Sequence, residues 1–281
     1  MSESKRGVSK QGVSKQGLSN REQLRLQREA QARRQRTGMR VIYAIAGVVV
    51  LAIIATVAIV VVQQSRKNDL APDPQVKQIS APNLNAAGTA IVQNPQVAGE
   101  VPTLTIYLDF QCPHCAAFNA THGDVLNQLA GAGEIRLEYS VTTVIGKAIG
   151  NEDASVKAGR AAFCADVAGV FPTYHDALLA GQPEREGDGF TDEQLRVTFA
   201  NQAGLQDADL TRFQQCYDTR ATATALDAEM AAAKPGFGGT TPQVSINGAN
   251  PTVEKDGQQV PWWADVQPTL GSWQSAIAAH S

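Results

Sequence analysis

The chain has 281 residues, of which 43% are hydrophobic and 18% charged, and its formal net charge is −3. None of these averages is extreme, which argues against a collagen-like protein, a wholly disordered one or one that crosses a membrane many times. The net charge is the sum of two parts of opposite sign. The first 40 residues contain eleven basic and three acidic side chains, and the remainder contains thirteen basic and twenty-four acidic ones.

Residues 1–40 are predicted to be a basic, disordered tail. Within it, residues 7–20 repeat a short polar unit punctuated by glycine, with too few apolar side chains to bury a core. A run of positive charge can also bind nucleic acid, but the tail contains no aromatic side chain that would stack on bases. We therefore expect no nucleic-acid partner.

Residues 41–62 form an apolar run of 22 residues without a charge. In a helix, at about 1.5 Å per residue, such a run spans a hydrocarbon core of about 30 Å. A cleaved signal peptide is the alternative, but such peptides have a shorter apolar region, a short basic lead and a small-residue cleavage site. Here the lead is 40 residues long and the run is followed by Gln-Gln-Ser-Arg-Lys. We predict an uncleaved transmembrane signal anchor.

The basic residues beside the apolar run predict its orientation. Four arginines lie between positions 33 and 40, whereas Arg66 and Lys67 are followed on the other side only by Lys77 before position 100. The positive-inside rule then places the N-terminus in the cytoplasm. The expectation is a single-pass protein of the cell membrane whose C-terminal domain is extracytoplasmic.

Residues 63–88 are predicted to be a semi-extended linker, because they mix Gln, Asn, Pro and Ala without a period. Residues 89–281 are long enough for one core with an insertion or for two small lobes. All four cysteines lie in this last part. An even number of cysteines in an oxidising compartment favours disulfide chemistry.

The first two cysteines lie at a predicted strand-to-helix junction. Apolar side chains alternate along residues 103–109, which predicts a strand, and recur at helical spacing after the second cysteine. The junction reads Cys112-Pro113-His114-Cys115. Proline suits the first turn of a helix, where no N–H donor is needed, and the positive end of the helix dipole stabilises a thiolate at Cys112.

A stabilised thiolate at Cys112 is a good leaving group and favours the reduced form, which makes the oxidised pair a strong oxidant. A hydrogen bond from the imidazole of His114 would favour the thiolate further, and Cys115, one turn into the helix, suits the resolving thiol. The alternatives are a strained structural disulfide and half of a zinc site. Because a zinc site needs a second ligand pair, for which His122 and His175 are poorly placed, we expect no metal. His175 is interpreted as a helix-surface or packing residue.

A second motif comes late in the chain. Residues 244–246 alternate as a short strand, Asn247-Gly248 is a hairpin turn signal, and Thr241-Pro242 precedes the strand. A proline at the start of a strand is tolerated where no ladder N–H is needed. By itself the dipeptide is a weak signal, because most X-Pro bonds are trans.

Together, the two motifs resemble those of the DsbA-like branch of the thioredoxin-fold oxidoreductases, and most of all its membrane-anchored extracytoplasmic members in actinobacteria. The resemblance covers about residues 89–281 and implies an α/β thioredoxin fold with an inserted α-helical domain at about 148–230. It implies that Cys112 is the nucleophile and Cys115 the resolving thiol. It also implies that Pro242 is cis and packs against the pair, and that Thr241 offers backbone hydrogen bonds to an extended substrate.

The sequence departs from this family at particular positions. The family carries a buried acid six residues before the first cysteine, and that position is Ile106 here. Asp109, three residues before the cysteine, is expected on the other face of the strand. Thr241 stands where the DsbA oxidase has valine, and a threonine there also occurs in isomerase-type relatives.

Cys164 and Cys216 lie in the inserted segment, each among apolar side chains at helical spacing. We predict that they form a structural disulfide, with two buried free thiols as the alternative.

The predicted function is that of an oxidase that donates the Cys112–Cys115 disulfide to reduced or unfolded exported proteins, with no other cofactor. The resemblance implies a membrane reoxidase of the DsbB or VKOR type as a partner. The alternatives are a disulfide isomerase or reductase of the same fold, and a peptide-binding chaperone without redox turnover.

Overall fold

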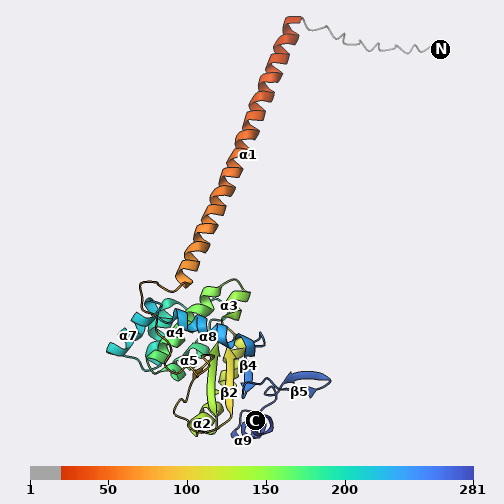
Figure 1. Ribbon diagram of the computed structural model, residues 1–281. Helices are drawn as coiled ribbons and strands as arrows, with labels where there is room; N and C mark the ends of the chain where they lie inside the picture. The colour runs from red at the N-terminus through yellow and green to blue at the C-terminus, as the bar shows by residue number, and fades with distance from the viewer. Residues whose placement is uncertain (1–19) are drawn as a thin grey trace, which may run out of the picture. The chain divides into compact units, whose positions relative to one another are not determined.

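Helix α1 (Asn20–Leu70) opens the part of the chain that the computed structural model describes, residues 20–281 (Figure 1). The chain divides into two compact units, Met1–Ser65 and Arg66–Ser281. Within α1, Ile42–Val62 has a mean hydropathy of 3.2 and is long and apolar enough to cross a membrane. Its side chains are exposed, so it is not the buried core helix of a soluble domain.

Residues 20–40 belong to this helix, which corrects the expectation that the whole basic tail is disordered. The segment is rich in Arg, Gln, Leu, Ala and Glu, which favour helix, and contains no proline. It also continues directly into the apolar run, so it extends a helix and needs no nucleation of its own. The glycine-punctuated repeat lies, up to residue 19, outside the described residues.

The predicted linker, residues 63–88, also differs from the expectation. Its first part is the end of α1, and its later part packs on the folded domain. The backbone N–H of Ile79 donates to the carbonyl of Ala221 at 2.8 Å. Asn83 donates from its backbone and its side chain to the carboxylate of Asp166, at 3.0 and 2.8 Å. Sequence composition predicted a free linker because the partners of these hydrogen bonds, Ala221 and Asp166, lie far along the chain.

A four-stranded sheet forms the centre of the second unit. Its strands are β1 (Ile91–Val92), β2 (Thr103–Leu108), β3 (Arg136–Val141) and β4 (Gln243–Ile246). The order across the sheet is β1-β3-β2-β4, in which β2 and β3 are parallel and the two edge strands are antiparallel to their neighbours. Helix α2 (Pro113–Gly131) connects the parallel pair.

A long helical segment lies between β3 and β4. It comprises α3 (Val144–Ala148), α4 (Glu152–Val167), α5 (Phe171–Ala180), the π-helix η1 (Gln194–Thr198), α6 (Phe199–Gln202), α7 (Asp207–Asp218), α8 (Ala223–Ala233) and the 3-10 helix η2 (Lys234–Gly236). Figure 1 shows α4, α5, α7 and α8 gathered to one side of the strands. This is the sheet with an α-helical insertion that the resemblance implies. The chain ends in a small hairpin, β5 (Thr252–Lys255) and β6 (Gln258–Pro261), and helix α9 (Leu270–His280).

Alternation along β2 gives the sheet two different faces. Ile106 and Leu108 face α2, where they meet Cys115 and Phe118 around a small cavity. The other face is more polar: the hydroxyl of Thr105 donates to the carboxylate of Glu138 at 3.3 Å. The side of the sheet that carries α2 is therefore mainly apolar, and the cysteine motif begins at its edge.

A disulfide joins Cys164 of α4 to Cys216 of α7, with the two Cα atoms 5.9 Å apart. Both residues are buried among the helices of the insertion. The bond closes a sequence separation of 52 residues, and so it holds the two longest helices of the insertion together.

Candidate active site

The cysteine motif lies where β2 gives way to α2. Cys112 is the N-cap residue of α2, with extended backbone angles, and Pro113 is the first residue of the helix. The backbone N–H of Cys112 donates to the carbonyl of Asp109 at 2.9 Å, and the carbonyl of Cys112 accepts from the N–H of Cys115 at 3.0 Å. The loop is thus fixed on both sides, and Cys112 sits at the positive end of the helix.

The two cysteines are free thiols in very different electrostatic environments. The pKa of Cys112 is lowered from 9.0 to about 6, first by a hydrogen bond from the Cys115 thiol, against the opposing effect of burial. The side chain of Thr241 and the backbone N–H groups of Cys115 and His114 lower it further. His114 acts here through its backbone, while its side chain is exposed.

Cys115 has the opposite character. Burial raises the pKa of its thiol far above the ordinary range, and its hydrogen bond to Cys112 and the charge on Cys112 raise it further. One thiol of the pair therefore ionises readily and the other is held protonated.

The late motif lies beside the first cysteine. The Thr241–Pro242 peptide bond is cis, and the carbonyl oxygen of Thr241 lies 3.4 Å from the sulfur of Cys112. Strand β4 follows directly and pairs with β2, with Ile106 opposite Val244. This pairing places Thr241 and Pro242 next to the cysteines. The structure thus brings Thr241 and Pro242 together with Cys112 and Cys115.

Asp109 is fully buried at the end of β2. Its carboxylate accepts from the backbone N–H of Gln111 and of Ile145, both at 2.9 Å, and from the hydroxyl of Ser155 at 2.8 Å. Burial raises its pKa to about 6 despite these bonds. The carboxylate is therefore bound to α3 and α4, and it is the backbone N–H of Asp109 that interacts with Cys115.

Comparison with known proteins agrees with this geometry. The sequence model of the family described as thioredoxin matches residues 100–260. The chain belongs to the thioredoxin family. Comparison with curated protein sequences gives no match.

Several solved structures are similar to this thioredoxin-family protein. MdbA, a thiol-disulfide oxidoreductase from Actinomyces oris, is 18% identical with a TM-score of 0.51, over 68% of this chain and 86% of MdbA. BdbD from Bacillus subtilis is 14% identical with a TM-score of 0.50, over 73% of this chain and 98% of BdbD. DsbA from Mycobacterium tuberculosis is 20% identical with a TM-score of 0.45, over 71% of this chain and 98% of DsbA. The likeness to MdbA and BdbD confirms the predicted thioredoxin fold.

Two glutamines of this thioredoxin-family protein were not identified from the sequence. The amide of Gln182 donates to the carbonyls of Phe110 and Cys112, at 2.9 and 3.0 Å. The side chain of Gln111 accepts from the backbone N–H of Gly189 at 3.1 Å. The inserted segment is thereby hydrogen-bonded to the active-site loop. No local motif marks a glutamine that follows a helix, so the sequence carried no signal for this contact.

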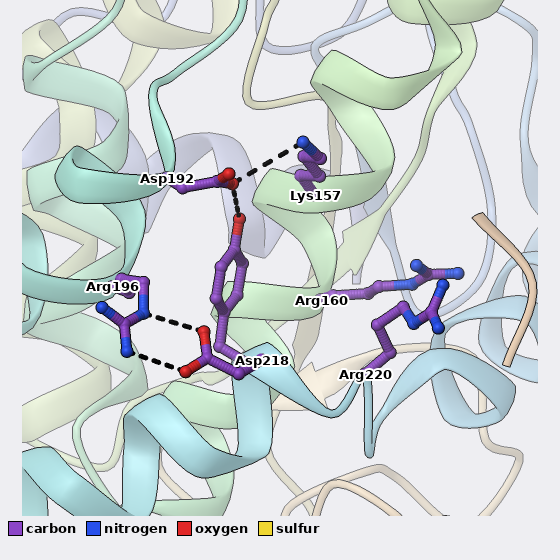
Figure 2. A pocket seen from close by; sticks show the side chains of 7 residues that line it. Lys157, Arg160, Asp192, Arg196, Asp218 and Arg220 are labelled. Carbon is purple, nitrogen blue, oxygen red and sulfur yellow. Dashed lines mark hydrogen bonds and ion pairs between the residues drawn. The ribbon is translucent and has the colours of Figure 1, made fainter. Parts of the chain in front are cut away.

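A cavity of about 480 Å³, much larger than the small one beside Cys115, lies among the inserted helices of this thioredoxin-family protein (Figure 2). Arg196 donates to both carboxylate oxygens of Asp218, at 2.8 and 2.7 Å, and the hydroxyl of Tyr217 donates to Asp192 at 2.7 Å. Lys157 of α4 lies 3.6 Å from Asp192. These bonds connect α4, η1 and α7, and none of the residues that line the cavity is a cysteine.

Metal binding receives no support from the side chains around the cysteines. His122 accepts a hydrogen bond from the indole of Trp273 at 3.2 Å and packs on Phe118. Within residues 20–281, no three His, Cys, Asp or Glu side chains come together as metal ligands would.

Alkylation of the reduced thioredoxin-family protein is expected to report the pKa of Cys112. Because the thiolate is the nucleophile, the rate with iodoacetamide should rise with pH and be half-maximal near pH 6. The Cys112→Ser variant, which retains Cys115 as its one free thiol, should react slowly below about pH 9. Mass spectrometry of the modified cysteine measures both. A half-maximal rate near pH 8.5 to 9 would contradict the assigned environment of Cys112.

Proposed function

We propose that the chain is a membrane-anchored thiol:disulfide oxidoreductase that introduces disulfide bonds into exported proteins through Cys112 and Cys115. The observation that carries the proposal is the asymmetry of the two thiols: Cys112 favours the thiolate and Cys115 the protonated thiol. This asymmetry gives the two sulfurs separate roles in a dithiol–disulfide exchange.

The reaction begins with the oxidised pair. A client thiolate attacks the sulfur of Cys112, the bond between Cys112 and Cys115 breaks, and its electron pair goes to Cys115. A second client thiolate then attacks the client sulfur of the mixed disulfide, and Cys112 leaves as a thiolate. The client gains a disulfide, and the protein keeps two electrons as the reduced pair.

The lowered pKa of Cys112 favours the oxidase direction. A low pKa makes Cys112 a good leaving group in the second step, and it stabilises the reduced protein relative to the oxidised one. A stabilised reduced state makes the disulfide a strong oxidant. Thr241 supports the isomerase as the second candidate, since a threonine before the proline also occurs in isomerase-type relatives.

The membrane anchor and partners complete the proposal. Ile42–Val62 would hold the domain at the outer face of the cell membrane, with the basic N-terminal segment in the cytoplasm. Clients would bind as extended chains along the backbone of Thr241, next to Cys112. A membrane reoxidase of the DsbB or VKOR type would return the pair to the disulfide, and no cofactor other than this disulfide is required.

The redox equilibrium of the full-length protein with glutathione, measured in detergent micelles, tests the direction of the reaction. We expect a potential closer to the roughly −120 mV of a strong disulfide oxidant than to the roughly −270 mV of a reducing thioredoxin. The oxidised protein should also introduce disulfides into a reduced, unfolded protein. A potential near −270 mV, or failure to oxidise that substrate, would reject the oxidase in favour of a reductase.

A further inference from the structure

The proposed reaction leaves Cys115 in need of a proton. When a client attacks Cys112, Cys115 departs as a thiolate into a buried site where burial raises the pKa of its thiol. When the pair is reoxidised, the same thiol must lose its proton. Ile106 lies beside Cys115 and cannot exchange a proton.

A cavity of about 10 Å³ adjoins Cys115 on the side of the sheet that carries α2. Its size is that of about one water molecule. Besides the phenol of Tyr139, three side chains around it can form hydrogen bonds, namely those of Cys115 and Asn119 of α2 and of His175 of α5. Pro242 closes it on the side of the late motif.

His175 is buried, with 1% of its surface exposed, and its ring lies 4.2 Å from that of Tyr139 between centroids. Its Nδ1 lies 3.0 Å from the carboxylate of Asp176. Its Nε2 is buried and has no hydrogen-bond partner among the described residues. A buried polar atom without a partner is destabilising, so packing alone does not explain an imidazole here.

Asp176 connects this histidine to solvent and to the helix of the cysteines. Its side chain is 45% exposed. It also accepts a hydrogen bond at 3.0 Å from Asn119, which lies one turn after Cys115. Burial raises the pKa of Asp176, but the hydrogen bonds and charge of its partners, His175 first among them, leave it lowered overall. The carboxylate therefore orients the imidazole so that Nδ1 faces Asp176, and Nε2 is the nitrogen left for the cavity.

We propose that His175 is the proton donor and acceptor of Cys115, acting through one water molecule in the cavity they share, with Asp176 as the link to solvent. This inference rests on the proposed function. As a client attacks Cys112, the imidazolium gives its proton to the Cys115 thiolate. As Cys115 attacks in the reverse sense, the neutral imidazole takes the thiol proton. The titratable groups around the imidazole are Asp176 on its own helix, Cys115 on α2 and Tyr139 on β3.

The reaction of the reduced full-length protein with one equivalent of DTNB separates the two cysteines. The Cys112 thiolate attacks DTNB, forms a mixed disulfide and releases one thionitrobenzoate. The Cys115 thiol then loses its proton, attacks Cys112 and releases the second thionitrobenzoate, so that one disulfide reagent is reduced and the pair is oxidised. Absorbance in a stopped-flow instrument follows both releases, and only the second needs a proton acceptor for Cys115.

In the His175→Gln variant we expect the first release at the wild-type rate and the second about 100-fold slower. The rate of the second release should continue to rise with pH up to about pH 9, because hydroxide must replace the imidazole. Asp176→Asn, which retains a hydrogen-bond acceptor without the charge, should slow the second release less. His280→Gln removes a histidine of α9 outside the cavity and should change neither step.

Each other outcome gives a definite answer. A second release at the wild-type rate in His175→Gln, or an equal slowing of both releases, would overturn the role of His175 and leave the proposed function standing. If Asp176→Asn folds where His175→Gln does not, its second release decides the question in the same way. If the wild-type protein itself fails to release the second thionitrobenzoate, the proposed function fails first.

Discussion

Replacement of Cys115 by alanine is expected to leave the protein covalently bound to its clients. Cys112 loses the hydrogen bond from Cys115 in this variant but keeps the effects of Thr241 and of the helix N-terminus, so its thiolate can still attack a client disulfide. The thiol that would then attack Cys112 and release the client is gone. Catalysed disulfide formation should fall by at least about 10³-fold, since a nucleophile and its partner act as a unit. Non-reducing electrophoresis of membranes should reveal complexes that a reductant dissolves.

Cys112→Ala provides the matched control for this experiment. The variant should lose activity to the same degree and form no complexes, because Cys115 is buried and held protonated. The double variant Cys112→Ala/Cys115→Ala should behave in the same way. If Cys112→Ala kept the full effect of the wild-type protein on its clients, the domain would instead be a peptide-binding chaperone without redox turnover.

Removal of the Cys164–Cys216 disulfide should lower the free energy of unfolding by about 4 kcal/mol. The bond closes a separation of 52 residues, and the chain-entropy model assigns about that stabilisation to a loop of this length. The experiment is urea unfolding of Cys164→Ala/Cys216→Ala in a background of Cys112→Ser/Cys115→Ser, which prevents thiol exchange during unfolding.

The background variant with the Cys164–Cys216 bond intact is the reference for this measurement. Both cysteines are buried, so alanine at these positions also leaves small cavities, which add to the loss. A loss below about 1 kcal/mol would mean that the packing of α4 on α7 holds the insertion without the covalent link.

The local parts of the site could be predicted from the sequence because they depend on neighbours in the chain. Alternating residues predict β2, and Pro113 predicts the start of α2, so Cys112 could be placed at a helix N-terminus. The apolar run of α1 could likewise be recognised from its length and hydropathy alone. Each of these predictions needs only a few consecutive residues.

The remaining parts depend on contacts across many residues. Gln182 reaches Cys112 from 70 positions away, and Asn83 reaches Asp166 across 83. No periodicity records such pairs, which is why the segment before β1 resembled a free linker. His175 was interpreted as a helix-surface or packing residue and is buried, but its position at the cavity beside Cys115 follows only from the placement of α5 next to α2.

The hydrogen bonds between the inserted segment and the active-site loop limit how far this protein could be shortened. The groups that fix the loop from outside are the backbone N–H groups of Ile145 and Gly189, the hydroxyl of Ser155 and the amide of Gln182. All of them lie between β3 and β4, in the stretch that a minimal thioredoxin scaffold would omit. A miniature that kept only the sheet, α2 and the cysteine motif would leave the carboxylate of Asp109 and the carbonyls of Phe110 and Cys112 without these donors. The inserted helices are therefore part of the catalytic framework, and a miniaturised enzyme would need a substitute for each donor.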